Sequence, residues 1–121
     1  MKRLLIVDDE PDITLAFKKG LECDEFEVDT FNDPLVALSS FKTNLYHLLL
    51  IDVKMPKMNG FELYQQMQKI DNKVRVCFIT AFEVYYEALR EIFPNLEVCC
   101  FIRKPIEMSD LISRIKLELA L

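Results

Sequence analysis

Short apolar runs alternate with segments of helical spacing along the whole chain. The runs are RLLIV (3–7), FEVDTF (26–31), LLLID (48–52), VRVCFIT (74–80) and VCCFI (98–102). Most of them are almost continuously apolar, which is typical of strands that are buried on both faces of a parallel sheet. The run 26–31 alternates apolar and polar residues instead, so we expect it at an edge of the sheet.

The segments between these runs have apolar residues three and four positions apart, the spacing of amphipathic helices. Their predicted inward faces are Ile13, Ala16, Phe17, Gly20 and Leu21; Ala37, Leu38 and Phe41; Leu63, Tyr64, Met67 and Ile70; Tyr85, Ala88, Leu89, Ile92 and Phe93; and Met108, Leu111, Ile112, Ile115 and Leu119. Strands and helices thus alternate five times. This pattern predicts an α/β fold, an open parallel sheet of five strands with helices on both faces.

Composition narrows the class of protein. The 121 residues predict one domain, residues 1–121, and the net charge of −5 argues against a direct nucleic-acid partner. The four cysteines form no C-x-x-C pair, and His47 has no companion at zinc-ligand spacing, so we expect reduced thiols. The apolar start, Leu4–Val7, is too short for a signal peptide, and no run approaches a membrane span. We expect a cytoplasmic protein without membrane segments.

Residues that could bind a metal or phosphate end or follow four of the five predicted strands, whereas the second is followed only by Asn32 and Asp33. Asp8 and Asp9 follow the first, Asp52 ends the third, Thr80 ends the fourth and Lys104 comes shortly after the fifth. The carboxyl ends of parallel strands meet at one edge of such a sheet, where binding sites form. We therefore expect these five side chains to share one site.

Three neighbouring carboxylates repel one another unless a cation compensates for them. Mg²⁺ prefers oxygen ligands, and one carboxylate beside it can accept a phosphoryl group as an aspartyl-phosphate. Each residue also has a simpler interpretation: Asp8 and Asp9 could favour a helix N-terminus, Thr80 could cap a helix, and Lys104 could be a solvated lysine. Their joint placement after the right strands favours a metal and phosphoryl site.

The chain resembles the receiver domain of two-component response regulators over its whole length. The resemblance rests on LLIVDDEPD, LLLIDVKMPKMNGFEL, FITA and FIRKP, in this order and spacing. It implies a doubly wound (βα)5 fold with the flavodoxin-like strand order 2-1-3-4-5. It also implies a phosphorylation-gated signalling switch, rather than an enzyme that turns over a separate substrate.

The resemblance implies a role for each residue of the site. Asp52 corresponds to the phosphoryl acceptor. Asp9 corresponds to a direct ligand of Mg²⁺ (or Mn²⁺), Asp8 acts on the metal through water, and the backbone carbonyl of Lys54 completes the protein ligands with Asp52. Lys104 pairs with the phosphoryl group.

The resemblance also implies a conformational switch. Thr80 moves toward the phosphoryl group, and the ring of Phe101 turns into the space that Thr80 leaves. Phe101 stands where many relatives have tyrosine, so an outward hydrogen bond from a hydroxyl is absent here. The bond between Lys104 and Pro105 is often cis in this family.

The resemblance implies partners as well. A sensor histidine kinase or a phosphotransfer protein supplies the phosphoryl group. The surface formed by the fourth helix, the fifth strand and the fifth helix then controls an output domain or partner protein; it should include Phe82, Tyr86, Arg103 and Glu107. Leu117 and Leu121 lie off the buried stripe of the fifth helix, where they would be frayed-end residues or part of a homodimer contact or a lead to an output domain.

Three other functions remain open at this point. A haloacid-dehalogenase-like phosphatase also forms an aspartyl-phosphate, but it needs D-x-D where this chain has the adjacent pair Asp8-Asp9. A flavodoxin-like nucleotide- or flavin-binding protein cradles phosphate in its first loop, which here is acidic. A pseudo-receiver would keep the fold as an interaction module and never take phosphate.

Overall fold

Five parallel strands form one sheet in the order β2-β1-β3-β4-β5. The computed structural model describes residues 1–81 and 100–120. The strands are β1 (Arg3–Val7), β2 (Glu27–Phe31), β3 (Leu48–Asp52), β4 (Arg75–Thr80) and β5 (Phe101–Arg103). The predicted parallel sheet and its strand order are therefore confirmed. The alternating strand β2 lies at an edge, as its pattern predicted.

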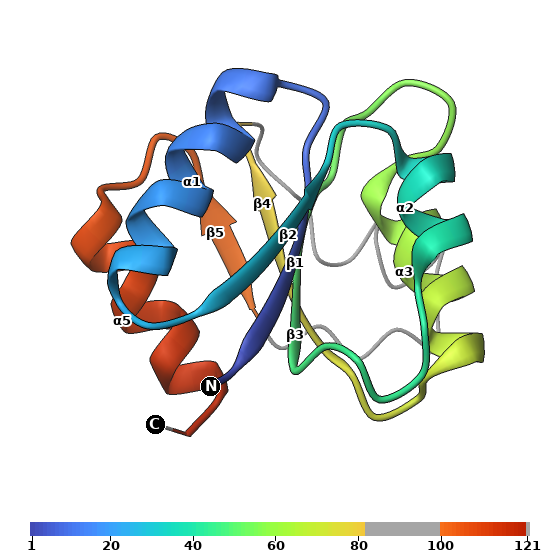
Figure 1. The fold of residues 1–121 in the computed structure, drawn as a ribbon. Helices are drawn as coiled ribbons and strands as arrows, with labels where there is room; N and C mark the ends of the chain where they lie inside the picture. Colours follow the sequence, from blue (N-terminus) through green and yellow to red (C-terminus); the bar gives the residue numbers. More distant parts are fainter. Residues whose placement is uncertain (82–99, 121) are drawn as a thin grey trace.

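Helices cover both faces of this sheet. They are α1 (Pro11–Cys23), α2 (Pro34–Ser40), α3 (Gly60–Ile70) and α5 (Met108–Glu118). Helices α1 and α5 lie on one face, and α2 and α3 on the other (Figure 1). The predicted helix around residues 85–93, with Phe82 and Tyr86, falls outside the described residues. None of the helices described here is long and apolar enough to cross a membrane.

Alternate residues of the central strands supply two separate apolar cores. Leu5 and Val7 of β1 point toward α2 and α3, whereas Leu4 and Ile6 point toward α1 and α5. All five residues of β3 are buried. This burial on both faces explains why the central strands read as continuous apolar runs.

Two predicted inward positions are wrong. Ala16 is exposed, and the buried positions of α1 are Thr14, Phe17 and Leu21. Thr14 can be buried because its hydroxyl donates to the carbonyl of Pro11 (3.0 Å) and accepts a hydrogen bond from Asn32 (3.0 Å). Ile70 is 41% exposed because it is the last residue of α3, where the helix leaves the core.

The last strand is shifted relative to its prediction. The run 98–102 predicted a strand that ends at Ile102, but β5 spans Phe101–Arg103, and Arg103 pairs with Thr80. Residues 98 and 99 lie outside the described part of the chain. The pairing matters for function, because it places Lys104 one residue beyond the carboxyl end of the sheet.

Candidate functional site

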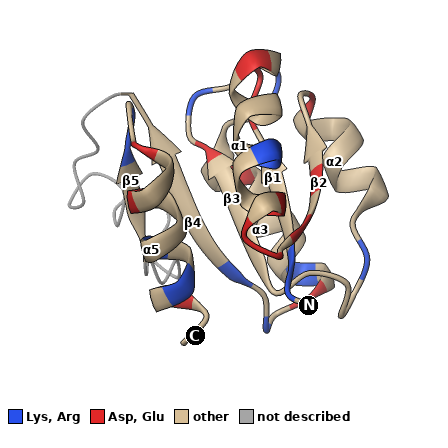
Figure 2. Cartoon of the chain, turned by 60° about the vertical axis from the view of Figure 1, so that its left-hand side comes forward, with Lys and Arg blue, Asp and Glu red and all other residues tan. Residues whose placement is uncertain are grey.

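The carboxyl ends of the strands bring the predicted site residues to one edge of the sheet. A cavity of about 450 Å³ opens there, lined by Asp9, Glu10, Asp52, Lys54, Met55, Pro56, Ala81 and Lys104. In Figure 2 the acidic end of β3 and the basic end of β5 lie at this same edge. The cavity thus combines carboxylates from β1 and β3 with the lysine that follows β5.

Asp8 is fixed at the end of β1 by the backbone around it. Its N–H donates to the carbonyl of Phe31 (3.1 Å), and its own carbonyl accepts a hydrogen bond from the Asn32 side chain (2.8 Å). Its carboxylate accepts from the N–H of Glu10 (2.9 Å), the residue that caps α1. Asp8 therefore does help to start the helix, but one carboxylate oxygen remains for the site.

Lys104 is the cation that compensates for this buried charge. Its ammonium donates to Asp8 at 2.7 Å and lies 3.7 Å from Asp52. The N–H of Lys104 donates to the carbonyl of Thr80 (2.8 Å), which holds the loop against β4, and the bond from Lys104 to Pro105 is cis, as the resemblance implied. Burial lowers the pKa of Lys104, but the hydrogen bond and charge of Asp8 outweigh burial and raise it overall. The simpler interpretation of Lys104 as a solvated side chain is wrong.

Asp52 lies in an environment that disfavours its charge. It is 4% exposed. The pKa of Asp52 is raised to about 7, and burial is the largest cause. The charges of Asp8 and Asp9 raise this pKa further, whereas the charge of Lys104 lowers it. The three carboxylates thus outnumber Lys104, which reaches two of them; Lys54, which also lines the cavity, is exposed. This shortage of positive charge, with oxygen atoms as the donors, fits a hard divalent cation such as Mg²⁺.

Glu10 also belongs to the acidic edge, although the sequence pattern did not mark it as a ligand. One carboxylate oxygen each from Asp8, Asp9 and Glu10 can be chosen so that all three lie within 4.8 Å of one another. Glu10 itself is exposed and lines the mouth of the cavity. Its position directly after the predicted pair is the only signal that could have identified it.

The loop after β3 is held against Asp52 by Gly60. The N–H of Gly60 donates to the carbonyl of Val53 (2.9 Å). A Cβ atom at residue 60 would lie 2.3 Å from the backbone oxygen of Asp52, so only glycine fits there. Asn59 and Glu62 form a capping box that starts α3 at this point. The end of β3 and the first turn of α3 therefore meet through backbone contact.

Two of the predicted switch residues, Thr80 and Phe101, lie on the neighbouring strands β4 and β5. Thr80 is 4% exposed at the end of β4. The ring of Phe101 is half-buried, with its centre 5.6 Å from that of Phe78 and 6.2 Å from that of Phe61. Phe101 thus covers the core beneath α3 and is one strand away from Thr80.

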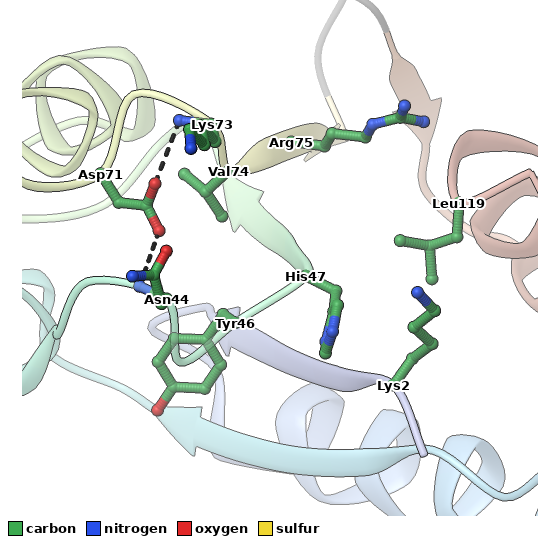
Figure 3. Close-up of a pocket in the computed structure, with 9 residues that line it drawn as sticks. All are labelled: Lys2, Asn44, Tyr46, His47, Asp71, Lys73, Val74, Arg75 and Leu119. Atoms are coloured by element: carbon green, nitrogen blue, oxygen red, sulfur yellow. Dashed lines mark hydrogen bonds between the residues drawn. The ribbon is translucent and has the colours of Figure 1, made fainter.

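A second cavity, of about 340 Å³, lies at the opposite edge and differs in charge. It is lined by Lys2, Asn44, Tyr46, His47, Asp71, Lys73, Val74, Arg75 and Leu119 (Figure 3). Its carboxylate, Asp71, accepts hydrogen bonds from the N–H groups of Asn44 and Lys73, both at 3.0 Å. The acidic site at the carboxyl edge therefore remains the candidate for metal chemistry.

Comparison with known proteins agrees with this geometry. The family model of the response regulator receiver domain matches residues 4–116. The chain belongs to the response regulator receiver family. Receivers are phosphorylation-dependent signalling domains, and this receiver spans about half the length of the transcriptional regulators that it matches. It is 35% identical to the CpxR homolog of Haemophilus influenzae, over 96% of this chain and 49% of that protein.

Shorter relatives and solved structures match the receiver end to end. The receiver protein CpdR of Brucella abortus is 30% identical, over 96% of this chain and 95% of that protein. A CheY-like receiver from Methanospirillum hungatei superposes with a TM-score of 0.88 at 28% identity, covering 99% of this chain and 94% of the other. TrrA of Thermotoga maritima, solved in complex with Mg²⁺ and BeF, superposes with a TM-score of 0.79 at 27% identity, covering 97% of this chain and 98% of that one.

Proposed function

We propose that this receiver is a switch that accepts a phosphoryl group on Asp52, with Mg²⁺ (or Mn²⁺) as its cofactor. The observation that carries the proposal is the pair of buried carboxylates, Asp8 and Asp52, that share one ammonium: Lys104 lies 2.7 Å from Asp8 and 3.7 Å from Asp52. The metal complex of the related TrrA supports the same cofactor. Receivers are switches and not enzymes for a separate substrate, and we place this chain with them.

Asp8, Asp9, Asp52 and the backbone carbonyl of Lys54 would hold the cation. When bound, it supplies positive charge that keeps Asp52 ionised and neutralises phosphoryl oxygens. In the transfer, a carboxylate oxygen of Asp52 forms a bond to phosphorus while the bond from phosphorus to the histidine nitrogen of the donor breaks. Lys104 then pairs with a phosphoryl oxygen in place of Asp8, and Thr80 donates a hydrogen bond to another.

The output follows from the movement of Thr80 and Phe101. As Thr80 moves toward the phosphoryl group, Phe101 turns inward, and the surface around β5 and α5 changes, with Arg103 and Glu107 on it. The two arrangements exist before phosphorylation, which biases their equilibrium.

We further propose that a histidine kinase or phosphotransfer protein in the cytoplasm is the donor, and that an output domain or partner protein reads the changed surface. The names of its relatives support both the donor and the output: they include transcriptional regulators and the sensor protein EvgS of Escherichia coli. Nucleic-acid contact would then be indirect, through the output partner, and Leu117 would contribute to a homodimer contact.

The test is phosphorylation with acetyl phosphate and Mg²⁺, followed by intact mass spectrometry. We expect one phosphoryl group on the wild type, and none on Asp52→Asn or after chelation of the metal. Asp33→Asn is the matched control, because Asp33 caps α2 at the same edge and pairs with Lys57 at 2.6 Å, outside the site. Asp33→Asn should be phosphorylated like the wild type. A folded wild type that gains no phosphoryl group from any donor would contradict the proposal and favour a pseudo-receiver.

A further inference from the structure

Two cysteines lie side by side in the core beneath α5, away from the phosphorylation site. Cys77 of β4 and Cys100, directly before β5, face each other in the strand register, since Phe78 pairs with Phe101. Both thiols belong to the core on the α5 side, and they are 0% and 2% exposed. Their sulfur atoms lie within 4.8 Å of each other.

Neighbouring strands are about 4.8 Å apart, and disulfides join Cα atoms about 4.4–6.8 Å apart. The backbone therefore already has the spacing that a disulfide between these strands requires.

The surroundings make the two thiols unequal. The Arg114 guanidinium of α5 donates to the sulfur of Cys100 (3.1 Å) and to the carbonyl of Phe101 (3.3 Å). The Cys77 thiol donates a hydrogen bond to the same sulfur, and this is the largest cause that lowers the pKa of Cys100. Burial and the charge of Glu118 raise that pKa, whereas the charge of Arg114 lowers it further. The same hydrogen bond, with burial, raises the pKa of Cys77. Ionisation is therefore favoured at Cys100 over Cys77, and the arginine that would stabilise the ionised sulfur lies 3.1 Å from it.

The charge around the pair favours redox chemistry over metal binding. Cys77, Cys100 and Glu118 could together offer three ligand atoms to a soft metal. However, Arg114 already occupies the positive position beside the Cys100 sulfur, and a second cation there would be repelled. A thiolate held beside an arginine is instead the arrangement of a reactive cysteine, and an adjacent thiol is what resolves its oxidation product.

We propose that Cys77 and Cys100 form a redox site, in which a peroxide converts the pair to a disulfide between β4 and β5. The Cys100 thiolate attacks one peroxide oxygen, the O–O bond breaks, and Cys100 becomes a sulfenic acid as hydroxide leaves. The Cys77 sulfur then attacks the Cys100 sulfur; the S–S bond forms, and the hydroxyl departs with the thiol proton as water. With the proton that Cys100 released on ionising, two thiols and one peroxide give one disulfide and two waters.

The position of the two cysteines determines how a peroxide reaches them and what their oxidation changes. The strand β5 has three residues and lies at the edge of the described sheet, and such edges open locally more easily than central strands. A peroxide is small enough to enter during such openings. The disulfide changes the Cys100 sulfur to which Arg114 donates, so the contact between α5 and the start of β5 changes on oxidation.

The experiment uses the whole chain with Cys23→Ser and Cys99→Ser, so that only the pair remains. The reduced protein is treated with hydrogen peroxide, quenched, unfolded and alkylated, and its intact mass is measured over time. We expect a monomer that has lost two hydrogens and takes up no alkylating reagent. Two thiols that stay fully alkylatable, at a peroxide concentration that oxidises the exposed Cys23 of the wild type, would overturn the proposal.

Two further variants separate the chemistry from mere proximity. Arg114→Gln should slow oxidation about tenfold for each unit by which the pKa of Cys100 rises. Lys116→Gln is the matched control: it removes the same charge from α5, but at a side chain that pairs with Asp24 (2.9 Å). Equal rates for the two variants would refute the role of Arg114. Cys77→Val, which keeps the volume, should accumulate a sulfenic acid that a 1,3-dione traps at Cys100; an unlabelled, folded variant would refute the order of steps.

Discussion

Gly60→Ala should damage both the stability and the phosphorylation of this receiver, although it adds only one methyl group. The new Cβ would lie 2.3 Å from the backbone oxygen of Asp52 and 3.0 Å from a side-chain carbon of Ile51. Carbon and oxygen atoms ordinarily meet at about 3.3–3.6 Å, so β3 and α3 must separate by about 1 Å. The neighbour is backbone, which cannot rotate away as a side chain can.

The expected size follows from two opposing effects. Overpacking of this kind costs about 1–3 kcal/mol, and the helix preference of alanine over glycine returns at most about 1 kcal/mol. We therefore expect a loss of about 1–2 kcal/mol in the free energy of unfolding, or about 4 °C in Tm for each kcal/mol. Because Asp52 moves with β3, phosphorylation by acetyl phosphate should slow at least about tenfold, since a shift of 1 Å can cost about 100-fold in rate.

Gly20→Ala is the matched control, because the nearest atoms to the same methyl group there belong to the flexible Met108 side chain, from Cε at 2.3 Å to Cγ at 2.8 Å, and not to backbone. That side chain can adopt another rotamer, and residue 20 gains helix preference within α1, so the change in stability should stay within about 0.5 kcal/mol. Urea unfolding measures both variants, and intact mass spectrometry measures their phosphorylation rates. If Gly60→Ala is as stable and as quickly phosphorylated as Gly20→Ala, the close contact between α3 and Asp52 does not exist as described.

Three other perturbations test the remaining contacts. Lys104→Met leaves the buried Asp8 and Asp52 without their cation. Without metal, the free energy of unfolding measured in urea should fall by about 3–5 kcal/mol, and Mg²⁺ should restore part of it. An unchanged free energy of unfolding would contradict the ion pair. Burial would raise the pKa of Asp29, but hydrogen bonds from Tyr46 and Arg3 lower it below its ordinary value of 3.8, so its contribution to stability is present above that pH and is lost as the pH falls through the lowered value. Acid unfolding followed by circular dichroism should therefore be steeper below pH 3.8 for the wild type than for Asp29→Asn, and equal slopes would contradict this. Asn59→Ala removes the capping box of α3 and should cost about 1 kcal/mol in urea unfolding, whereas Asn59→Asp, which keeps the accepting oxygen, should cost less.

The sheet was predictable because its central strands are buried on both faces. Leu48–Asp52 and Arg75–Thr80 form continuous apolar runs for that reason, whereas the edge strand Glu27–Phe31 carries polar residues because only Val28 of its residues is buried. The helix faces were less certain. Spacing alone placed Ala16 inside and Thr14 outside, but the hydrogen bond between Thr14 and Asn32, two residues far apart in sequence, reverses the two.

The site was predictable as a set of residues but not as a set of contacts. Topology brings the residues after parallel strands to one edge, so Asp8, Asp52 and Lys104 could be grouped without coordinates. The sequence does not show that the Lys104 ammonium lies closer to Asp8 (2.7 Å) than to Asp52 (3.7 Å). Lys104 and Asp8 are 96 residues apart in the chain. The same holds for Cys77 and Cys100, whose pairing depends on the register of a strand that begins later than its apolar run.

Lys104 pairs with Asp8 because hydrogen bonds from neighbouring residues hold Asp8 in position. Asp8 accepts hydrogen bonds from the backbone N–H of Glu10 and from the side chain of Asn32. These two contacts fix the direction of its other carboxylate oxygen independently of Lys104. Asp52 has burial and two carboxylate neighbours that disfavour its charge. An ammonium that lies between them therefore gains more from Asp8, whose position is fixed. This leaves Asp52 less compensated than Asp8, so that it gains from a cation and from a new partner for Lys104.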